Sequence, residues 1–217
     1  MSGTGSPLWV EGPTDRANAR KLQLILKDAE DWRRKHGVQF ETSKYVLIHF
    51  TRNHRQATKT SITAGGVKVK PASEAKYLGV ILDQKLNFKS HLQYITKKGT
   101  KAAMALSGIA KSNWGVQYQQ SRQLFKAVIA TRTDYAALVW HRPKSDQSMA
   151  TNKQNRKLTK VQRLAMKAIP GCYKTTPTTS MELETGLEPL EFASKRKSSS
   201  PPHGYNHSQQ NILSKSG

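Results

Sequence analysis

The segment from Ala75 to His91, AKYLGVILDQKLNFKSH, constrains the fold most, because the period of the apolar residues changes within it. Its first half favours a strand, a polar turn follows, and Asn87 is predicted to cap a long helix. Gly79 lies inside the strand pattern, which indicates a bulge or the close approach of another backbone. Strand and helix patterns mix upstream of this segment, and only helical patterns follow it. The segment therefore separates two architectures.

The upstream part of the chain predicts a small antiparallel sheet with one packed helix. Apolar residues at helical spacing predict a helix over residues 15–36, capped by Thr14 and ended by a glycine. A central strand is expected over residues 44–50. The dipeptide Gly65-Gly66 favours a two-residue hairpin turn. The order helix, strand, hairpin, strand indicates the α+β class.

The downstream part predicts a bundle of helices. Helices are expected over residues 88–109, 118–140 and 158–169, with a short fourth helix from a Thr176 cap to Gly186. Tyr135 and Leu138 are expected on the core face of the second of these helices. The predicted domain organisation is a disordered start at 1–7, strands with one helix at 8–86, helices at 87–142, a loop at 143–156, helices at 157–190 and a disordered tail at 191–217.

The charge balance restricts the partners of the chain. Lys and Arg number 36 against 14 acidic residues, a formal net charge of +22. A compact body of this charge repels itself unless a polyanion lies nearby, so nucleic acid is the favoured partner and an anionic membrane surface the second. The alternative that the chain is a soluble basic protein without a polyanionic partner stays open. Because the cations are spread along the chain, we expect the polyanion against the folded body.

The sequence lacks the residue patterns of several kinds of functional site. The single cysteine, Cys172, excludes an internal disulfide and favours a reducing compartment, and no histidines and cysteines have zinc-ligand spacing. No phosphate-binding glycine loop and no adjacent aspartates occur, and Asp28 and Asp31 suit salt bridges with neighbouring arginines better than metal binding. No apolar run is long enough to span a membrane, so we expect an intracellular protein, with the nucleus as one candidate compartment.

Basic residues that flank the predicted strands or lie on the first predicted downstream helix could contact a phosphate backbone. They are Lys44, Arg52, Arg55, Lys76, Lys97, Lys98 and Lys101. For any one of them a solvated surface cation is the alternative, whereas the set as a whole favours nucleic acid. Tyr77 is the aromatic residue that we expect nearest to a bound strand.

Several segments resemble reverse transcriptases of non-LTR (LINE-like) retrotransposons, with the fungal members the most similar. Residues 32–44, WRRKHGVQFETSK, 76–83, KYLGVILD, and 86–91, LNFKSH, are similar to the region after the active-site box. Downstream, KVQR at 160–163, IPGCYKTTP at 169–177 and GLEPL at 186–190 are similar to the link between the thumb and a ribonuclease H domain. The resemblance covers about residues 8–190.

This resemblance implies roles for particular residues. Lys44 matches a palm lysine near the phosphates of the incoming nucleotide. Tyr77, Leu78 and Gly79 match the primer grip, a hairpin that holds the end of the primer, and the helices after Asn87 match the thumb, which packs on the backbone of the duplex. The implied fold is a partial palm followed by a helical thumb, and the implied partner is an RNA and DNA template–primer.

The sequence departs from this family at the catalytic carboxylates. The box of the family ends in two aspartates just before the position of Leu8, where this chain has GTGSP at 3–7. The family uses Mg²⁺, and without these ligands the charge that develops on the transferred phosphate is not stabilised. We therefore expect no catalytic and no metal-binding residues in this chain. The resemblance implies a truncated or degenerate reverse transcriptase that binds nucleic acid.

Two alternatives stay open. One is a basic RNA- or DNA-binding adaptor co-opted from such a protein, and the other is the product of a pseudogene fragment. The sequence does not predict the oligomeric state.

Overall fold

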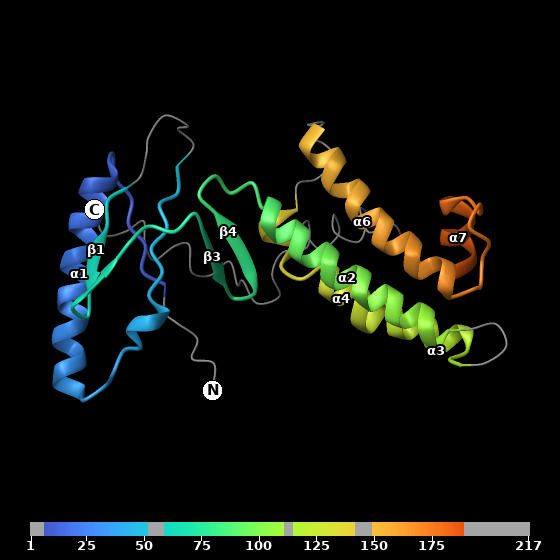
Figure 1. The fold of residues 1–217 in the computed structure, drawn as a ribbon, viewed down its shortest axis with the longest axis horizontal. Coiled ribbons are helices and arrows are strands. Elements are labelled where there is room, and N and C mark those ends of the chain that lie inside the picture. The colour runs from blue at the N-terminus through green and yellow to red at the C-terminus, as the bar shows by residue number, and fades with distance from the viewer. Residues whose placement is uncertain (1–6, 52–58, 111–114, 142–148, 189–217) are drawn as a thin grey trace, which may run out of the picture. The chain divides into compact units, whose positions relative to one another are not determined.

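The computed structural model describes residues 7–51, 59–110, 115–141 and 149–188 (Figure 1). They form an α+β structure with helices and two antiparallel hairpins, and this confirms the predicted class. The chain divides into two compact units, Met1–His91 and Leu92–Gly217. The boundary expected after residue 86 stays a prediction. Most of the segments predicted to be disordered, 1–7 and 191–217, lie outside the described residues.

Helix α1, Asp15–His36, begins and ends where the sequence predicts. The Oγ1 of Thr14 accepts a hydrogen bond from the backbone N–H of Ala17 at 3.2 Å. Gly37 ends the helix with φ of 63°, in the left-handed region that glycine adopts without strain. The last turn carries four basic residues, which suit the negative end of the helix dipole.

The predicted Gly65-Gly66 hairpin is confirmed. Strands β1, Ile62–Ala64, and β2, Val67–Val69, pair antiparallel around two glycines with φ of 57° and 78°. Both φ values are positive, as a two-residue turn of this kind requires. A small core joins the hairpin to the rest of the first unit: Leu47, Ala64 and Val69 are buried, with Leu22 and Leu26 of α1 packed against them.

The strand predicted over 44–50 is wrong. Lys44 ends a short 3-10 helix, η1, Thr42–Lys44, and the pairing found for this segment among the described residues is a single bridge from Leu47 to Pro71. Proline has no backbone N–H and cannot continue a ladder of hydrogen bonds. The alternation expected of a half-buried strand survives, since Leu47 and His49 are buried and Val46 is 59% exposed.

The strand predicted around Gly79 is also wrong, because the chain reverses there. Strands β3, Glu74–Tyr77, and β4, Val80–Asp83, pair antiparallel, with Tyr77 opposite Val80. Leu78 has φ of 44° and Gly79 φ of 82°, so both lie in the left-handed region that a two-residue turn needs. Gly79 therefore belongs to a turn and not to a bulge.

Helix α2, Lys89–Ile109, starts two residues after Asn87, so the predicted Asn87 cap is wrong. The carboxylate of Asp83 instead holds this corner: it accepts the backbone N–H of Asn87 at 3.0 Å and that of Phe88 at 2.7 Å. The predicted apolar face of α2 is largely buried. Its members Leu92, Ile95, Ala103 and Leu106 are buried, whereas Ile109 is 43% exposed.

The helix predicted over 118–140 is interrupted. It consists of α3, Tyr118–Leu124, a π-helical segment η2, Phe125–Ala130, α4, Thr131–Thr133, and α5, Ala137–Trp140. The wider π turn and the left-handed Ala136, φ 52°, rotate the following residues relative to a regular helix. Tyr135 and Leu138 are consequently more than half exposed, against expectation, whereas Ala137 and Trp140 are buried.

Helices α6, Met149–Ala168, and α7, Thr178–Thr185, complete the second unit. Because α6 starts at Met149, residues 149–156 of the predicted loop are helical, and residues 143–148 lie outside the described residues. Pro177, not Thr176, precedes the first residue of α7, and Gly186 ends that helix in the left-handed region with φ of 56°, as predicted. The core of this unit is formed by Ala103, Leu106, Phe125, Ile129, Val161, Ala165, Met166, Ile169, Met181 and Leu187.

Among the described residues, none of the helices is long and apolar enough to span a bilayer.

Candidate nucleic-acid interface

The β3–β4 hairpin brings four predicted site residues to one exposed turn. Lys76 and Tyr77 end β3, and Leu78 and Gly79 form the turn (Figure 1). Lys76 is exposed, Tyr77 is 37% exposed and Leu78 is 59% exposed. An ammonium, an aromatic ring and an aliphatic side chain are therefore accessible within one short loop. Such a loop can contact both the phosphates and the bases at the end of a strand.

Contacts with the start of α2 hold this hairpin. The buried His91 accepts the backbone N–H of Ile81 through Nδ1 at 3.3 Å, so the proton of the neutral ring is on Nε2. Burial lowers the pKa of His91, because a charged imidazolium loses its hydration there. The hydroxyl of Ser90 also donates to the carboxylate of Glu74 on β3. Two side chains at the start of α2, His91 and Ser90, therefore hold the hairpin that carries the turn.

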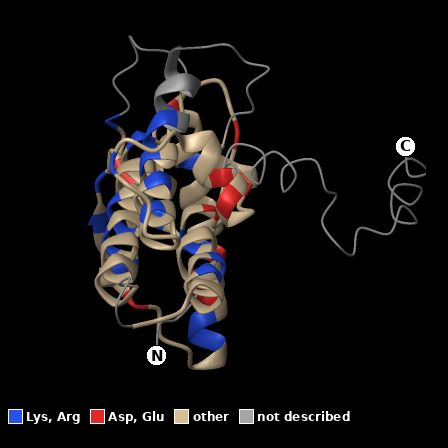
Figure 2. Cartoon of the chain, turned by 90° about the vertical axis from the view of Figure 1, so that its right-hand side faces the viewer, with Lys and Arg blue, Asp and Glu red and all other residues tan. Residues whose placement is uncertain are grey.

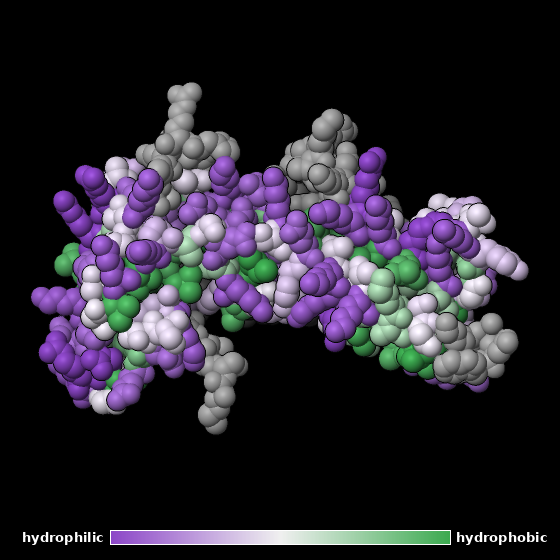
Figure 3. Space-filling view, in the orientation of Figure 1, coloured by the Kyte–Doolittle hydropathy of each residue, from purple (hydrophilic) through white to green (hydrophobic). Residues whose placement is uncertain are grey.

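The three predicted lysines of α2 form a set on the helix surface. Lys97, Lys98 and Lys101 are all exposed, and their spacings of three and four residues place them near one another. The Nζ of Lys98 lies 4.5 Å from the ring centroid of Tyr94. None of the three forms an ion pair with a described residue. Figure 2 shows that Lys and Arg recur along the helices, and Figure 3 shows many hydrophilic side chains on the face in view.

The remaining predicted cations are not all described. Lys44 is exposed at the end of η1, in the first unit, whereas the α2 lysines belong to the second. Arg52 and Arg55 lie outside the described residues. The structure therefore gathers the predicted residues into two groups, the β3–β4 turn and the α2 lysines, with Lys44 apart from both in sequence.

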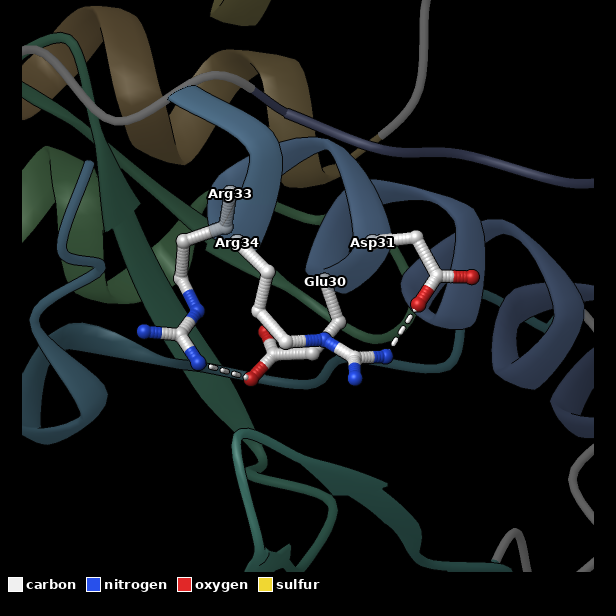
Figure 4. A network of polar contacts seen from close by, with 4 residues as sticks. All are labelled: Glu30, Asp31, Arg33 and Arg34. Carbon is white, nitrogen blue, oxygen red and sulfur yellow. Dashed lines mark hydrogen bonds and ion pairs between the residues drawn. The ribbon is translucent and has the colours of Figure 1, made fainter. Parts of the chain in front are cut away.

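Two of the four acidic residues of α1 form ion pairs with arginines, and one of the two is Asp31, as predicted. Glu30 and Arg33 form an ion pair at 3.0 Å, and Asp31 pairs with Arg34 (Figure 4). Both pairs span one helical turn and are partly exposed, so each contributes little to stability. No three His, Cys, Asp or Glu side chains among the described residues are grouped so that they could hold a metal ion.

A group of lysines that the sequence prediction missed lies on the β1–β2 hairpin. Lys59, Lys68 and Lys70, with Ser61 and Pro71, line an open hollow of about 370 Å³. The available signal was the spacing of Lys68 and Lys70 on either side of the buried Val69, since alternate residues of a strand share a face. Lys59 could not be added to them without knowledge of the strand pairing.

The comparisons with known proteins connect this basic α+β chain to the proteins of mobile elements. It is 23% identical over 188 residues, 87% of its length, to a 115 kDa protein in the type-1 retrotransposable element R1DM of Drosophila melanogaster. It is 23% identical over 84% of its length to the retrovirus-related Pol polyprotein from element R1 of Bradysia coprophila. It is 24% identical over 55% of its length to the RNA-directed DNA polymerase from mobile element jockey of Drosophila funebris.

These similarities support a distant relation to RNA-directed DNA polymerases of non-LTR retrotransposons. The chain spans only 18%, 17% and 13% of the length of these three relatives. No family model and no solved structure matches the chain.

Proposed function

We propose that this chain is a segment of a non-LTR retrotransposon reverse transcriptase that holds a template–primer duplex and lacks polymerase activity by itself. Residues 8–86 correspond in this proposal to the C-terminal part of the palm and the helices from residue 87 to the thumb. The relatives that match most of the chain support the relation to non-LTR retrotransposons, and the correspondence to palm and thumb rests on the sequence resemblance. The fungal origin expected from the sequence stays a prediction, since the relatives described above come from Drosophila and Bradysia.

The observation that carries the proposal is the exposed β3–β4 turn immediately before a helix with exposed lysines. In the resemblance, Tyr77, Leu78 and Gly79 correspond to the primer grip, a hairpin, and these residues do end one strand and form a turn. Lys97, Lys98 and Lys101 then serve as phosphate contacts of the thumb, and Lys44 as a contact of the incoming nucleotide. RNA and DNA strands are accordingly the proposed partners. The proposed setting is intracellular, with the nucleus as one candidate compartment.

A second function, a basic RNA- or DNA-binding adaptor, requires only the excess of 36 Lys and Arg residues over 14 acidic residues. Both functions require the same duplex-binding surface, and they differ in whether a catalytic partner completes the site. Mixing the chain with a polymerase segment that carries the two aspartates separates them. Stimulated primer extension supports the reverse-transcriptase assignment, and binding without stimulation supports the adaptor.

Duplex binding is tested by titrating the full chain against a labelled RNA–DNA hybrid at several salt concentrations. Each phosphate contact adds about 0.9 to the negative slope of log K against log salt for a duplex, so the three α2 lysines alone predict a slope near −3. Lys97→Gln with Lys101→Gln should reduce the slope by about 2. Lys98 is left in place because its ammonium lies over Tyr94. An affinity that is insensitive to salt contradicts the proposal.

The expected lack of polymerase activity has its own measurement. The purified chain should not extend a primer in the presence of Mg²⁺ and nucleoside triphosphates, because the sequence lacks the paired aspartates that position the metal ions. Metal-dependent incorporation of nucleotides by the chain alone contradicts this part of the proposal.

A further inference from the structure

The β1–β2 hairpin has two chemically different faces. Ala64 and Val69 are buried on one face, toward Leu22 and Leu26 of α1. Lys68 on β2 and Lys70, the first residue after β2, flank Val69, and both are exposed and line the hollow. Because successive side chains of a strand point to opposite faces, burial of Val69 directs both lysines to the other face. The packing of the hairpin on α1 thus determines where these two cations point.

The first wall of the hollow, with Lys59 and Ser61, is held through the residue between them. The hydroxyl of Thr60 donates to the carboxylate of Asp15 at 2.7 Å, and the Nε2–H of His49 donates to the carbonyl of Thr60 at 2.8 Å. The hydrogen bond from Thr60 is the main cause that lowers the pKa of Asp15. With Thr60 tied to α1 and to His49, the positions of Lys59 and Ser61 are restricted.

The opposite wall, at Pro71, is held as well. Pro71 forms the bridge with Leu47, and the backbone N–H of Ala72 donates to the carbonyl of Leu47 at 2.8 Å. Both walls therefore rest on hydrogen bonds to separate segments of the first unit. A hollow with fixed walls presents its charges with less loss of side-chain freedom on binding than three lysines on a mobile loop.

The lining of the hollow contains three ammonium groups, one hydroxyl and no carboxylate. All of these polar groups can donate hydrogen bonds, and together they suit an anion with several oxygens. We propose that this hollow, the β1–β2 lysine site of Lys59, Lys68 and Lys70, binds phosphodiester groups of a nucleic-acid backbone. The site rests on the proposed function and extends it to a surface that lies outside the β3–β4 turn and the α2 lysines.

The test compares the full-length wild type with two double variants on a labelled RNA–DNA hybrid over a range of salt. Lys68→Gln with Lys70→Gln removes two cations from the hollow. Lys27→Gln with Lys35→Gln removes two exposed cations from α1 and is the matched control for net charge. The first pair should reduce the salt slope by about 1.8 and weaken binding about tenfold or more at ~0.1 M salt, whereas the control should change neither substantially.

Lys59→Gln is a third variant, which should reduce the slope by about 0.9 without a change in either strand. Equal slopes for the two double variants, with wild-type binding intact, overturn the β1–β2 lysine site and leave the proposed function standing. If the wild type does not bind the hybrid, both the β1–β2 lysine site and the proposed function are contradicted. If the Lys68 and Lys70 variant loses only the binding of a free nucleoside triphosphate, the hollow takes free nucleotides and the inference is also overturned.

Discussion

At the scale of single residues, the β3–β4 turn combines an unfavourable backbone with exposed side chains. Leu78 has a positive φ of 44°, a region that costs an L-residue with a branched side chain roughly 1–2 kcal/mol. A residue such as Asn relieves much of this cost, and Asn-Gly is the preferred pair in turns of this type. The presence of Leu at the turn fits a position whose side chain serves binding, because strained residues gather at functional sites.

The substitution Leu78→Asn therefore separates stability from binding. We expect the free energy of unfolding to rise by about 1 kcal/mol, since Asn adopts the left-handed region more readily than Leu. If Leu78 contacts the primer, affinity for an RNA–DNA hybrid should fall at the same time. Urea unfolding and hybrid titration on the same preparations measure the two effects. A variant that is less stable than the wild type contradicts the account of the turn.

His91 predicts a pH dependence. Burial lowers its pKa in the folded chain, so between this value and the usual value near 6.5 the unfolded chain binds a proton that the folded chain does not. Stability is therefore full above about pH 6.5 and is lost as the pH falls below it. Gln at this position removes the titration and keeps an acceptor for the N–H of Ile81.

The measurement is the free energy of unfolding of the wild type and of His91→Gln at about pH 7.5 and about pH 5.5. Acidification should destabilise the wild type more than the variant, because other titrating groups are shared. Equal losses in the two proteins would falsify the assignment to His91.

At the scale of elements, α2 depends on close packing at one glycine. A Cβ added to Gly99 would lie 2.9 Å from the Cγ2 of Thr133 and 2.9 Å from the Cγ1 of Val161. Carbon atoms cannot approach so closely without movement of the neighbouring side chains. Gly99 thus allows α2 to lie near α4 and α6, although glycine in a helix is itself unfavourable.

A pair of substitutions in this one helix tests the contact. Gly99→Ala should destabilise the chain by about 1–3 kcal/mol through overpacking, less the gain in helix propensity. Gly108→Ala should stabilise it by up to about 1 kcal/mol, because nothing lies within 4 Å of the added Cβ. Thermal or urea unfolding gives both values. Changes of the same sign at the two positions contradict the packing described for α2.

At the scale of the whole molecule, the 36 Lys and Arg residues outnumber the 14 acidic residues, so most of the cations have no acidic residue to pair with one to one. The two ion pairs of α1 are themselves partly exposed. Salt therefore screens more repulsion than attraction in this chain. A polyanion that binds the folded state adds its own stabilisation by mass action.

We accordingly expect the Tm of the full chain to rise when NaCl is increased from low to moderate concentration at neutral pH. An RNA–DNA hybrid at low salt should raise the Tm as well, and added salt should diminish this second effect as binding weakens. Differential scanning fluorimetry with and without the hybrid measures both. A Tm that falls with NaCl contradicts the dominance of self-repulsion.

Features that depend on neighbours along the chain follow from the order of the amino acids alone. The Thr14 cap, the Gly37 end of α1 and the Gly65-Gly66 turn follow from residues that satisfy or release local backbone constraints. The buried face of α2 follows from helical spacing. The sequence alone also shows which residues of the candidate interface are basic.

Features that depend on residues far apart in the chain require the folded structure. The segment 44–50 forms its bridge with Pro71, which cannot extend a ladder, and the π-helical segment before α4 turns Leu138 away from the core. The apolar pattern around Gly79 predicted a continuous strand, whereas the resemblance implied a hairpin, because leucine is unusual in the left-handed region that the turn requires. Lys59 meets Lys68 and Lys70 only through strand pairing and the contacts of Thr60, because spatial neighbours are set by hydrogen bonds and packing between segments far apart in the chain.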